Sequence, residues 1–188
     1  MIGATVAAMK HTLLAAAALL ALTLPGSLHA ALPQGARAPD IVTQGAIGGK
    51  AFKFNLRAAL RKGPVVLYFY PKAFTKGCTL EARAFAEAHD QFAAAGATVI
   101  GMSNDDLPTL QRFSTEECRN KFAVAIASPA TIKAYDVELK RDGLPAGLSD
   151  RTSYVIGRDG RIRLVHSDLD YRDHVRLTLE SVKGSAKR

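Results

Sequence analysis

The feature that most constrains the fold is an alternation of strand patterns and helix patterns in the middle of the chain. Residues 65–70, VVLYFY, form a continuous apolar run typical of a strand buried on both faces, and residues 97–103, ATVIGMS, fit the next strand. Between them, from Thr79 to Ala95, apolar residues recur at steps of three and four, which predicts a helix. The following NDD and Pro108 predict the start of another helix. This βαβα order predicts parallel central strands covered by helices.

The flanking segments predict antiparallel additions to this centre. Residues 50–55, KAFKFN, alternate as a half-buried strand, and LRAALRK after them fits a short helix. Residues 151–167 predict a hairpin around Asp159–Gly160, because this dipeptide tolerates positive φ in a tight turn. A last helix is predicted from His174 to Lys183. Together the elements predict an α/β, thioredoxin-like fold, with a mixed central sheet, helices on both faces and an antiparallel hairpin near the C-terminus.

The beginning of the chain has the pattern of a secretory signal peptide. Lys10 precedes an apolar run, residues 13–25, that is too short for a confident membrane span. Cleavage is expected after Ala30, which makes residues 1–30 the leader and residues 31–188 the folded domain. The alternative, an uncleaved membrane anchor, is disfavoured because no basic stop-transfer flank follows the run. The sequence therefore predicts a protein exported to a bacterial periplasm, without stable membrane association after cleavage.

The charge is positive but scattered. The 188 residues carry a formal net charge of +8, which falls to +7 when Lys10 is removed with the leader. The basic residues form no run of five or more, and no helix-turn-helix, zinc-finger or aromatic-interleaved basic motif accompanies them. A solvated basic surface is expected, and no nucleic-acid partner.

The two cysteines, Cys78 and Cys118, lie 40 residues apart in the mature domain. This spacing allows one disulfide but excludes a C-x-x-C redox motif and a zinc site. The mature histidines, His89, His166 and His174, are interpreted as surface or helix-end residues, because no second ligand lies at metal spacing. No metal and no cofactor are expected.

Cys78 follows a Pro- and Gly-containing loop and falls in the first turn of a predicted helix. There, unpaired backbone N–H groups and the positive end of the helix dipole favour the thiolate, so Cys78 is a candidate nucleophile. Gly77 permits close backbone approach, Pro71 shapes the loop, and Thr75 offers a hydroxyl to a polar substrate atom. Taken singly, these residues also fit ordinary turn positions and an inert, packed thiol.

The segment PKAFTKGCTLE resembles the P-x-x-x-T-x-x-C signature of the peroxiredoxins, the alkyl hydroperoxide reductase/thiol-specific antioxidant family. The similarity extends from GARAPDIV, residues 35–42, to RTSYVIGRDGRI, and so covers nearly all of the mature chain. Within the family, YFYPKAFTKGCTLEARAF is most similar to the bacterioferritin comigratory protein, or PrxQ, branch.

The resemblance implies a peroxidase for hydrogen peroxide and small organic hydroperoxides that uses no metal or haem. Cys78 would be the peroxidatic cysteine, oxidised to a sulfenic acid, and Thr75 would hydrogen-bond the peroxide. Arg151, placed just before a late strand, would favour the thiolate and stabilise the charge that develops as the O–O bond breaks. Backbone N–H groups around Gly77 would hold the peroxide oxygens, and Glu81 would orient an arginine.

The resemblance also gives Cys118 a role. One subgroup carries its resolving cysteine five residues after the peroxidatic one, where this chain has Arg83. Another places it in the helix after the next strand, near Cys118, so an intramolecular Cys78–Cys118 disulfide is expected, formed after local unwinding. Two alternatives stay open: a one-cysteine enzyme, and an exported thioredoxin-fold binding or structural domain with a static disulfide. The reductant is expected to be a thioredoxin-like protein, and the chain a monomer or a dimer.

Overall fold

The computed structural model describes residues 31–186, and the predicted signal peptide, residues 1–30, lies outside them. All the predicted strands and helices are present in the described chain, together with three elements that were not predicted. Their order is β1 (Val42–Ile47), β2 (Lys50–Asn55), α1 (Leu56–Lys62), β3 (Val65–Phe69), α2 (Lys76–Ala94), β4 (Thr98–Ser103), α3 (Leu107–Glu116), β5 (Ala123–Ile126), α4 (Pro129–Ala134), β6 (Thr152–Ile156), β7 (Ile162–Ser167) and α5 (Arg172–Ala186). None of the helices in this range has the length and apolar character needed to cross a membrane.

The strands form one mixed sheet in the order β2-β1-β5-β4-β3-β6-β7. Strand β3 pairs in parallel with β4, and β4 pairs in parallel with β5, which confirms the predicted parallel centre. On its other side β3 pairs antiparallel with β6, so Leu67 lies between Ile100 and Tyr154. The β6–β7 hairpin closes one edge of the sheet, and a second hairpin, β1–β2, closes the other.

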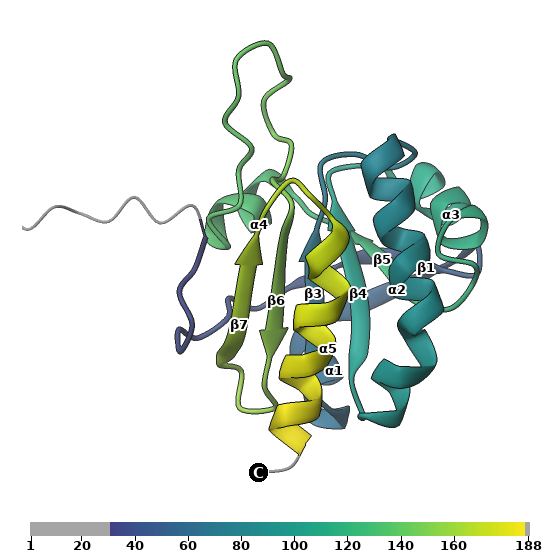
Figure 1. The fold of residues 1–188 in the computed structure, drawn as a ribbon. Coiled ribbons are helices and arrows are strands. Elements are labelled where there is room, and N and C mark those ends of the chain that lie inside the picture. Colours follow the sequence, from purple (N-terminus) through teal and green to yellow (C-terminus); the bar gives the residue numbers. More distant parts are fainter. Residues whose placement is uncertain (1–30, 187–188) are drawn as a thin grey trace, which may run out of the picture.

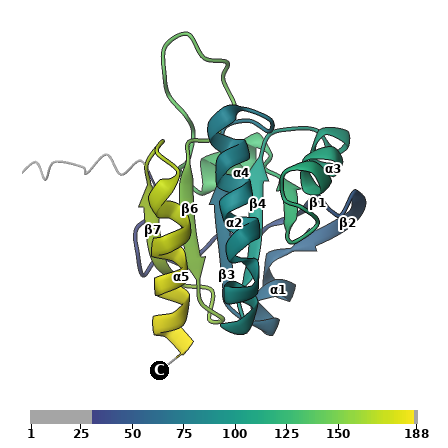
Figure 2. The same ribbon diagram turned by 45° about the vertical axis from the view of Figure 1, so that its right-hand side comes forward.

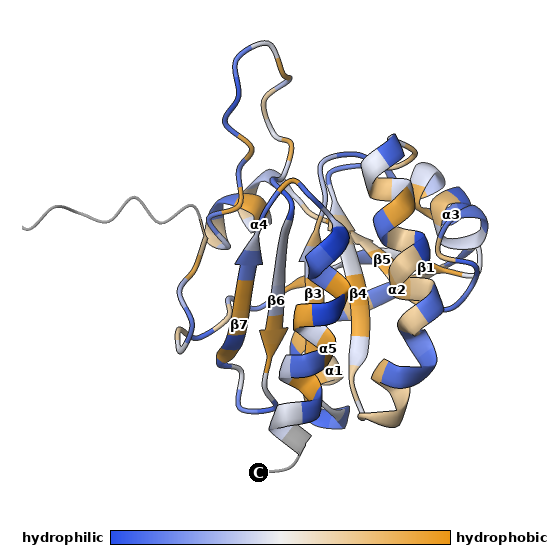
Figure 3. Cartoon of the chain, in the orientation of Figure 1, coloured by the Kyte–Doolittle hydropathy of each residue, from blue (hydrophilic) through white to orange (hydrophobic). Residues whose placement is uncertain are grey.

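Helices cover both faces of the sheet, as Figures 1 and 2 show. In β3, Val66 and Tyr68 point toward the layer of α2, α3 and α5, and the Tyr68 ring stacks on Phe85 of α2 with 4.4 Å between ring centroids. Val65 and Leu67 point the other way, into a second apolar cluster that includes side chains of α1 and α4. Figure 3 shows the corresponding concentration of apolar residues in the central strands. Burial of each large apolar side chain in these clusters stabilises the fold by about 1.5–3 kcal/mol. Together these side chains hold the end of β3 and the start of α2, where Cys78 lies.

Three elements, β1, β5 and α4, escape the sequence pattern. Strand β1 has the sequence VTQGAI, and its glycine makes the segment resemble a loop in the sequence. The structure explains Gly45: a Cβ there would lie 2.6 Å from the Val124 carbonyl oxygen of β5. Strand β5 is only four residues long, AVAI, too short for its pattern to separate strand from helix.

Two predicted boundaries also differ. Helix α2 begins at Lys76, three residues before the expected Thr79, because Thr75 has the extended conformation of an N-cap residue. The hairpin turn is longer than the predicted two-residue turn: the Gly157 N–H donates to the Arg161 carbonyl, and in the dipeptide only Gly160 has positive φ, +76°.

Candidate active site

The loop between β3 and α2 is held from two sides. The Asp105 carboxylate oxygen Oδ2 accepts hydrogen bonds from the Ala73 N–H and from the Ser103 hydroxyl, both at 2.8 Å. The Ser149 hydroxyl donates to the Tyr70 carbonyl at 2.8 Å. The end of β4 and the segment before β6 therefore fix the loop that leads to Cys78. Asp105 and Ser149 were not among the predicted site residues; the signal for Asp105 is its place two residues after a central parallel strand.

Pro71 begins this loop immediately after Tyr70, and Thr75 ends it as the N-cap of α2. The Thr75 carbonyl accepts from the Thr79 N–H at 2.9 Å, which starts the helical bonding pattern. Its hydroxyl does not cap the helix but donates to the Lys72 carbonyl at 3.0 Å. Because that bond uses the hydroxyl proton, the oxygen is left as an acceptor for an O–H group, such as that of a hydroperoxide.

Cys78 is the third residue of α2 and is only 1% exposed. The first N–H groups of a helix have no partner within it and carry its positive partial charge. The placement predicted for Cys78, in a helical first turn, is therefore confirmed. Its sulfur lies where a negative charge is stabilised.

Arg151 brings three groups together at this point. It directly precedes β6 and is 4% exposed. Its Nη2 donates to the Cys78 sulfur at 3.5 Å, its Nη1 donates to Glu81 Oε2, and its Nε donates to the Leu169 carbonyl at 2.9 Å. A Cβ on Gly77 would lie 3.0 Å from Arg151 Nη2, so the glycine makes room for the guanidinium. The structure thus brings together Cys78, Arg151, Glu81 and Gly77, four of the residues that the family resemblance singles out.

The pair formed by Glu81 and Arg151 is buried and tightly coupled. Burial raises the pKa of Glu81 above its ordinary value, although the Arg151 charge and hydrogen bond act in the opposite direction. Burial also works to lower the pKa of Arg151, but the charges of Glu81 and Cys78 outweigh it and leave that pKa above its ordinary value. Arg151 therefore stays cationic beside the sulfur, and Glu81 depends on Arg151 for compensation of its charge.

His174 is the main residue of this region that the sequence interpretation missed. It lies at the start of α5, which fits the expected helix-end position, but it is fully buried. Its Nδ1 lies 2.8 Å from the Ser153 hydroxyl and 3.7 Å from Glu81 Oε1. The sequence does hold a signal: His174, Thr178 and Val182 recur at steps of four and are all buried on one face of the helix.

Cys118 lies two residues beyond the end of α3, in a turn, rather than within the predicted helix. The cause is the next two residues, Arg119 and Asn120, whose φ angles of 51° and 60° cannot continue a right-handed helix. Both thiols are free and buried in the same apolar cluster, so the structure does not contain the static disulfide of the alternative reading. Burial raises the pKa of Cys118, and the neighbouring Glu117 charge adds to the effect.

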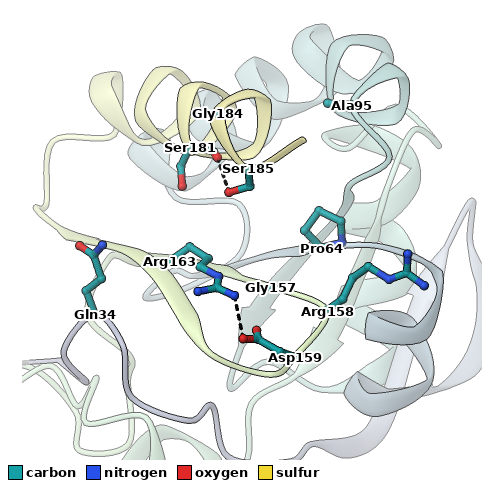
Figure 4. Close-up of a pocket in the computed structure, with 10 residues that line it drawn as sticks. All are labelled: Gln34, Pro64, Ala95, Gly157, Arg158, Asp159, Arg163, Ser181, Gly184 and Ser185. Carbon is teal, nitrogen blue, oxygen red and sulfur yellow. Dashed lines mark hydrogen bonds and ion pairs between the residues drawn. The ribbon is translucent and has the colours of Figure 1, made fainter. Parts of the chain in front are cut away.

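A cavity of about 850 Å³ lies at the other end of the sheet from Cys78 (Figure 4). Its lining includes Pro64, which precedes β3, and Ala95, which follows α2, whereas Cys78 lies after β3 and at the start of α2. Arg163 also lines it and donates to Asp159 at 2.7 Å. This cavity is therefore separate from the cysteine site. Within residues 31–186, no three His, Cys, Asp or Glu side chains gather as a metal-binding group.

Comparison with known proteins identifies the family and agrees with the fold. The sequence profile described as the AhpC/TSA family matches residues 34–165, which include Cys78 and Arg151. The chain belongs to the AhpC/TSA family. This family member is 29% identical over 157 residues to peroxiredoxin Bcp of Bacillus subtilis (strain 168), a match that covers 82% of this chain and 97% of that protein.

Solved structures agree with the family assignment. Peroxidoxin BcpB of Mycobacterium tuberculosis is 27% identical with a TM-score of 0.72, covering 80% of this chain and 96% of that one. The bacterioferritin comigratory protein of Xanthomonas campestris, studied for its alkyl peroxide reduction activity, is 25% identical with a TM-score of 0.66, covering 76% and 91%. The chain is accordingly a peroxiredoxin of the Bcp/PrxQ kind, a thiol-dependent enzyme that takes a hydroperoxide substrate and a thiol reductant.

Proposed function

We propose that this peroxiredoxin reduces hydroperoxides at Cys78 and resolves the product with Cys118 as an intramolecular disulfide. The observation that carries the first part is the 3.5 Å contact between Arg151 Nη2 and the Cys78 sulfur, at the first turn of α2. The contact places a permanent cation against the sulfur and next to the helix dipole.

In the first step the Cys78 thiolate attacks the terminal oxygen of the hydroperoxide. An S–O bond forms, the O–O bond breaks, and the leaving alkoxide or hydroxide takes up a proton to give alcohol or water. The sulfur is oxidised to sulfenic acid and the peroxide is reduced. Thr75 accepts the peroxide O–H, and N–H groups at Gly77 and Cys78, with Arg151, stabilise the charge on the oxygens.

In the second step the Cys118 thiol attacks the sulfenic sulfur, which forms an S–S bond and releases water. Cys118 is fully buried and burial disfavours its thiolate, so the turn that carries it has to open before it reacts. The consecutive left-handed residues Arg119 and Asn120 are strained positions, which favours rearrangement at this turn. A thioredoxin-like dithiol then reduces the disulfide and restores both thiols.

Organic hydroperoxides are favoured as substrates alongside hydrogen peroxide. Two exposed apolar side chains belong to the segments that hold the reacting groups: Phe74 and Leu169. Phe74 directly precedes Thr75, and the Leu169 carbonyl accepts from Arg151. Exposed apolar groups at a site supply contact surface for the apolar tail of an alkyl hydroperoxide.

We further propose that the enzyme is exported to the periplasm. The support is the Lys10 flank and the apolar run of residues 13–25. The test is N-terminal sequencing of the protein from a periplasmic fraction, which should begin at Ala31. A protein that stays in the membrane fraction with its leader would contradict this part and leave the peroxidase chemistry untouched.

The chemistry is tested by intact mass after one equivalent of hydrogen peroxide, for the reduced wild type, Cys78→Ser and Cys118→Ser. The wild type should lose two hydrogens, Cys118→Ser should gain one oxygen, and Cys78→Ser should stay unchanged. If wild type and Cys118→Ser both stop at the sulfenic acid, Cys118 is not resolving and an external thiol reduces Cys78 directly. If the wild type does not react within seconds, Cys78 is not peroxidatic.

A further inference from the structure

A buried polar cluster lies behind the Arg151–Glu81 pair, where α5 packs on β6. It consists of His174, Ser153 and the inner edge of Glu81, all with zero exposed area. Polar groups in an apolar interior destabilise a fold unless they are hydrogen-bonded, so the bonding of each atom indicates what the cluster does.

The bonds of His174 define its tautomer. Its Nε2 lies 2.9 Å from the Asp168 carbonyl, which can only accept, so Nε2 carries the hydrogen. In the neutral ring Nδ1 is then an acceptor, and the Ser153 hydroxyl donates to it at 2.8 Å. Burial lowers the pKa of His174 to about 4, and the charges of His166 and Arg151 act in the same direction. At neutral pH the imidazole is therefore uncharged and has one fixed orientation.

The acceptor of the Nε2 bond belongs to a segment that also holds Arg151. The Asp168 N–H donates to the Arg151 carbonyl at 3.2 Å, and the next carbonyl, that of Leu169, accepts from Arg151 Nε at 2.9 Å. The Asp168–Leu169 dipeptide thus contacts both the backbone and the guanidinium of Arg151. His174 is bonded to the carbonyl between those two contacts.

The His174 ring also lies beside Oε1, the Glu81 carboxylate oxygen that does not bond Arg151. Glu81 Oε2 accepts from Arg151, while Oε1 has no hydrogen-bond partner among residues 31–186 and faces His174 Nδ1 at 3.7 Å. Since Nδ1 is already an acceptor for Ser153, the ring offers Glu81 no competing donor. The carboxylate stays on Arg151 and accepts from Nη1, while the Leu169 carbonyl accepts from Nε.

We propose that His174 is a positioning residue for the peroxidatic site: its Nε2–H bond to Asp168 and its neutral Nδ1 edge against Glu81 keep Arg151 Nη2 aimed at the Cys78 sulfur. The inference rests on the proposed function, because the role of Arg151 at the sulfur belongs to it. His174 itself does not touch the reacting atoms.

The test compares His174→Gln, His174→Asn and His174→Leu by the second-order rate constant for reaction of Cys78 with hydrogen peroxide. Glutamine can place an amide N–H near the position of Nε2 and should keep the rate within about threefold. Asparagine reaches only the position of Nδ1 and leucine reaches neither, so both should slow the reaction by about 10- to 100-fold, the effect expected when a reacting geometry is displaced by about 1 Å. Equal rates for Gln and Leu would overturn the proposal.

A matched control separates positioning from general loss of stability. Val182 is fully buried on the same helix, two turns beyond His174. Val182→Ala should lower the free energy of unfolding but leave the peroxide rate at the wild-type value. If Val182→Ala slows the reaction as much as His174→Asn, the effect of His174 is only structural.

The tautomer of His174 can be measured on the wild-type protein, so this test does not depend on whether a variant folds. Nitrogen chemical shifts of His174 at pH 7 should report a neutral ring with hydrogen on Nε2. A hydrogen on Nδ1, or an imidazolium, would overturn the proposal even in an active peroxidase. Loss of the proposed function is distinguishable from this outcome, because it would appear as a wild type whose Cys78 does not react at all.

Discussion

The Arg83 guanidinium bonds the Glu117 carboxylate, with 2.7 Å between Nε and Oε2, and so ties α2 to the residue that precedes Cys118. Two longer ion pairs join the same two segments, Glu87 with Arg119 at 3.4 Å and Asp90 with Lys121 at 3.7 Å. The three pairs together are called the seam. These pairs hold the Cys118 turn against α2 in the reduced protein. Because five of these six side chains are 46% exposed or more, salt weakens the pairs.

Arg83→Gln should speed disulfide formation. An ion pair of this kind contributes up to about 1 kcal/mol, so its loss should raise the rate from sulfenic acid to disulfide by about two- to fivefold. The first step, oxidation of Cys78, should not change. Quenched-flow intact mass measures both steps. Arg176→Gln, which removes exposed ion pairs of α5, is the control and should behave as wild type. An unchanged or slower second step in Arg83→Gln would contradict the role of the seam.

Gly77→Ala should slow peroxide reduction by about tenfold with little loss of stability. The new Cβ would lie 3.0 Å from Arg151 Nη2, so the guanidinium has to shift away from the sulfur. The matched control is Gly184→Ala in α5, where a Cβ meets no atom within 4 Å. That change should keep full activity and add about 0.5–1 kcal/mol of stability. Rates of hydrogen peroxide consumption and urea denaturation report the two effects, and equal rates for both variants would refute the close contact.

Arg151→Met should destabilise the fold by about 3–5 kcal/mol, because it leaves the buried Glu81 carboxylate without its partner. The double variant Arg151→Met with Glu81→Gln removes the uncompensated charge and should recover much of that stability. Its peroxide rate should stay about 100-fold below wild type, since the donor at the sulfur is still missing. Recovery of activity along with stability would show that Arg151 acts only in folding.

Stability should depend on His174 in acid. The folded pKa of His174 is lowered to about 4 from an ordinary value of 6.5. Between these values the unfolded chain binds the proton and the folded one does not, so the free energy of unfolding falls as the pH drops from 6.5 to 4. The fall reaches about 3 kcal/mol relative to His174→Gln.

The groups that face His174 decide how this comparison is made. Glu81, Arg151, His166 and Asp168 surround the ring, and Glu81 titrates in the opposite sense. Because burial raises its folded pKa, the contribution of Glu81 to stability is greatest at low pH and is lost as the pH rises. Because Glu81 is present in both proteins, the difference between wild type and His174→Gln isolates the histidine. Parallel stability curves from pH 4 to 6.5 would rule the effect out.

Leu169→Ser should weaken the use of bulky peroxides. Leu169 is 39% exposed and its carbonyl accepts from Arg151, so loss of its apolar side chain should raise the KM for cumene hydroperoxide severalfold and leave hydrogen peroxide kinetics unchanged. Val42→Ser, an equivalent change at an exposed apolar residue of β1, is the control. An identical effect on both peroxides would remove Leu169 from substrate binding.

The sequence predicts those parts of the fold whose residues follow a periodic pattern. Strand β3 is predicted because both of its faces are apolar, and helix α2 is predicted because one of its faces is continuously apolar. Arg151 is found through the family resemblance. Strand β1 is hidden because Gly45 serves a close backbone approach that exists only in the assembled sheet. His174 is missed because a histidine and a threonine occupy two of the three buried positions on its helix face. Contacts between residues so distant along the chain leave no local pattern.

The complete burial of Cys118 gives the two redox forms different surfaces. In the reduced protein this sulfur is part of the apolar cluster that also contains Phe113 and Phe122. A disulfide that draws Cys118 away from these rings exposes them to solvent. Oxidation by peroxide would therefore change the exposed surface of the molecule. A reductant that binds newly exposed aromatic surface could then select the spent enzyme and ignore the molecules that are ready for another peroxide.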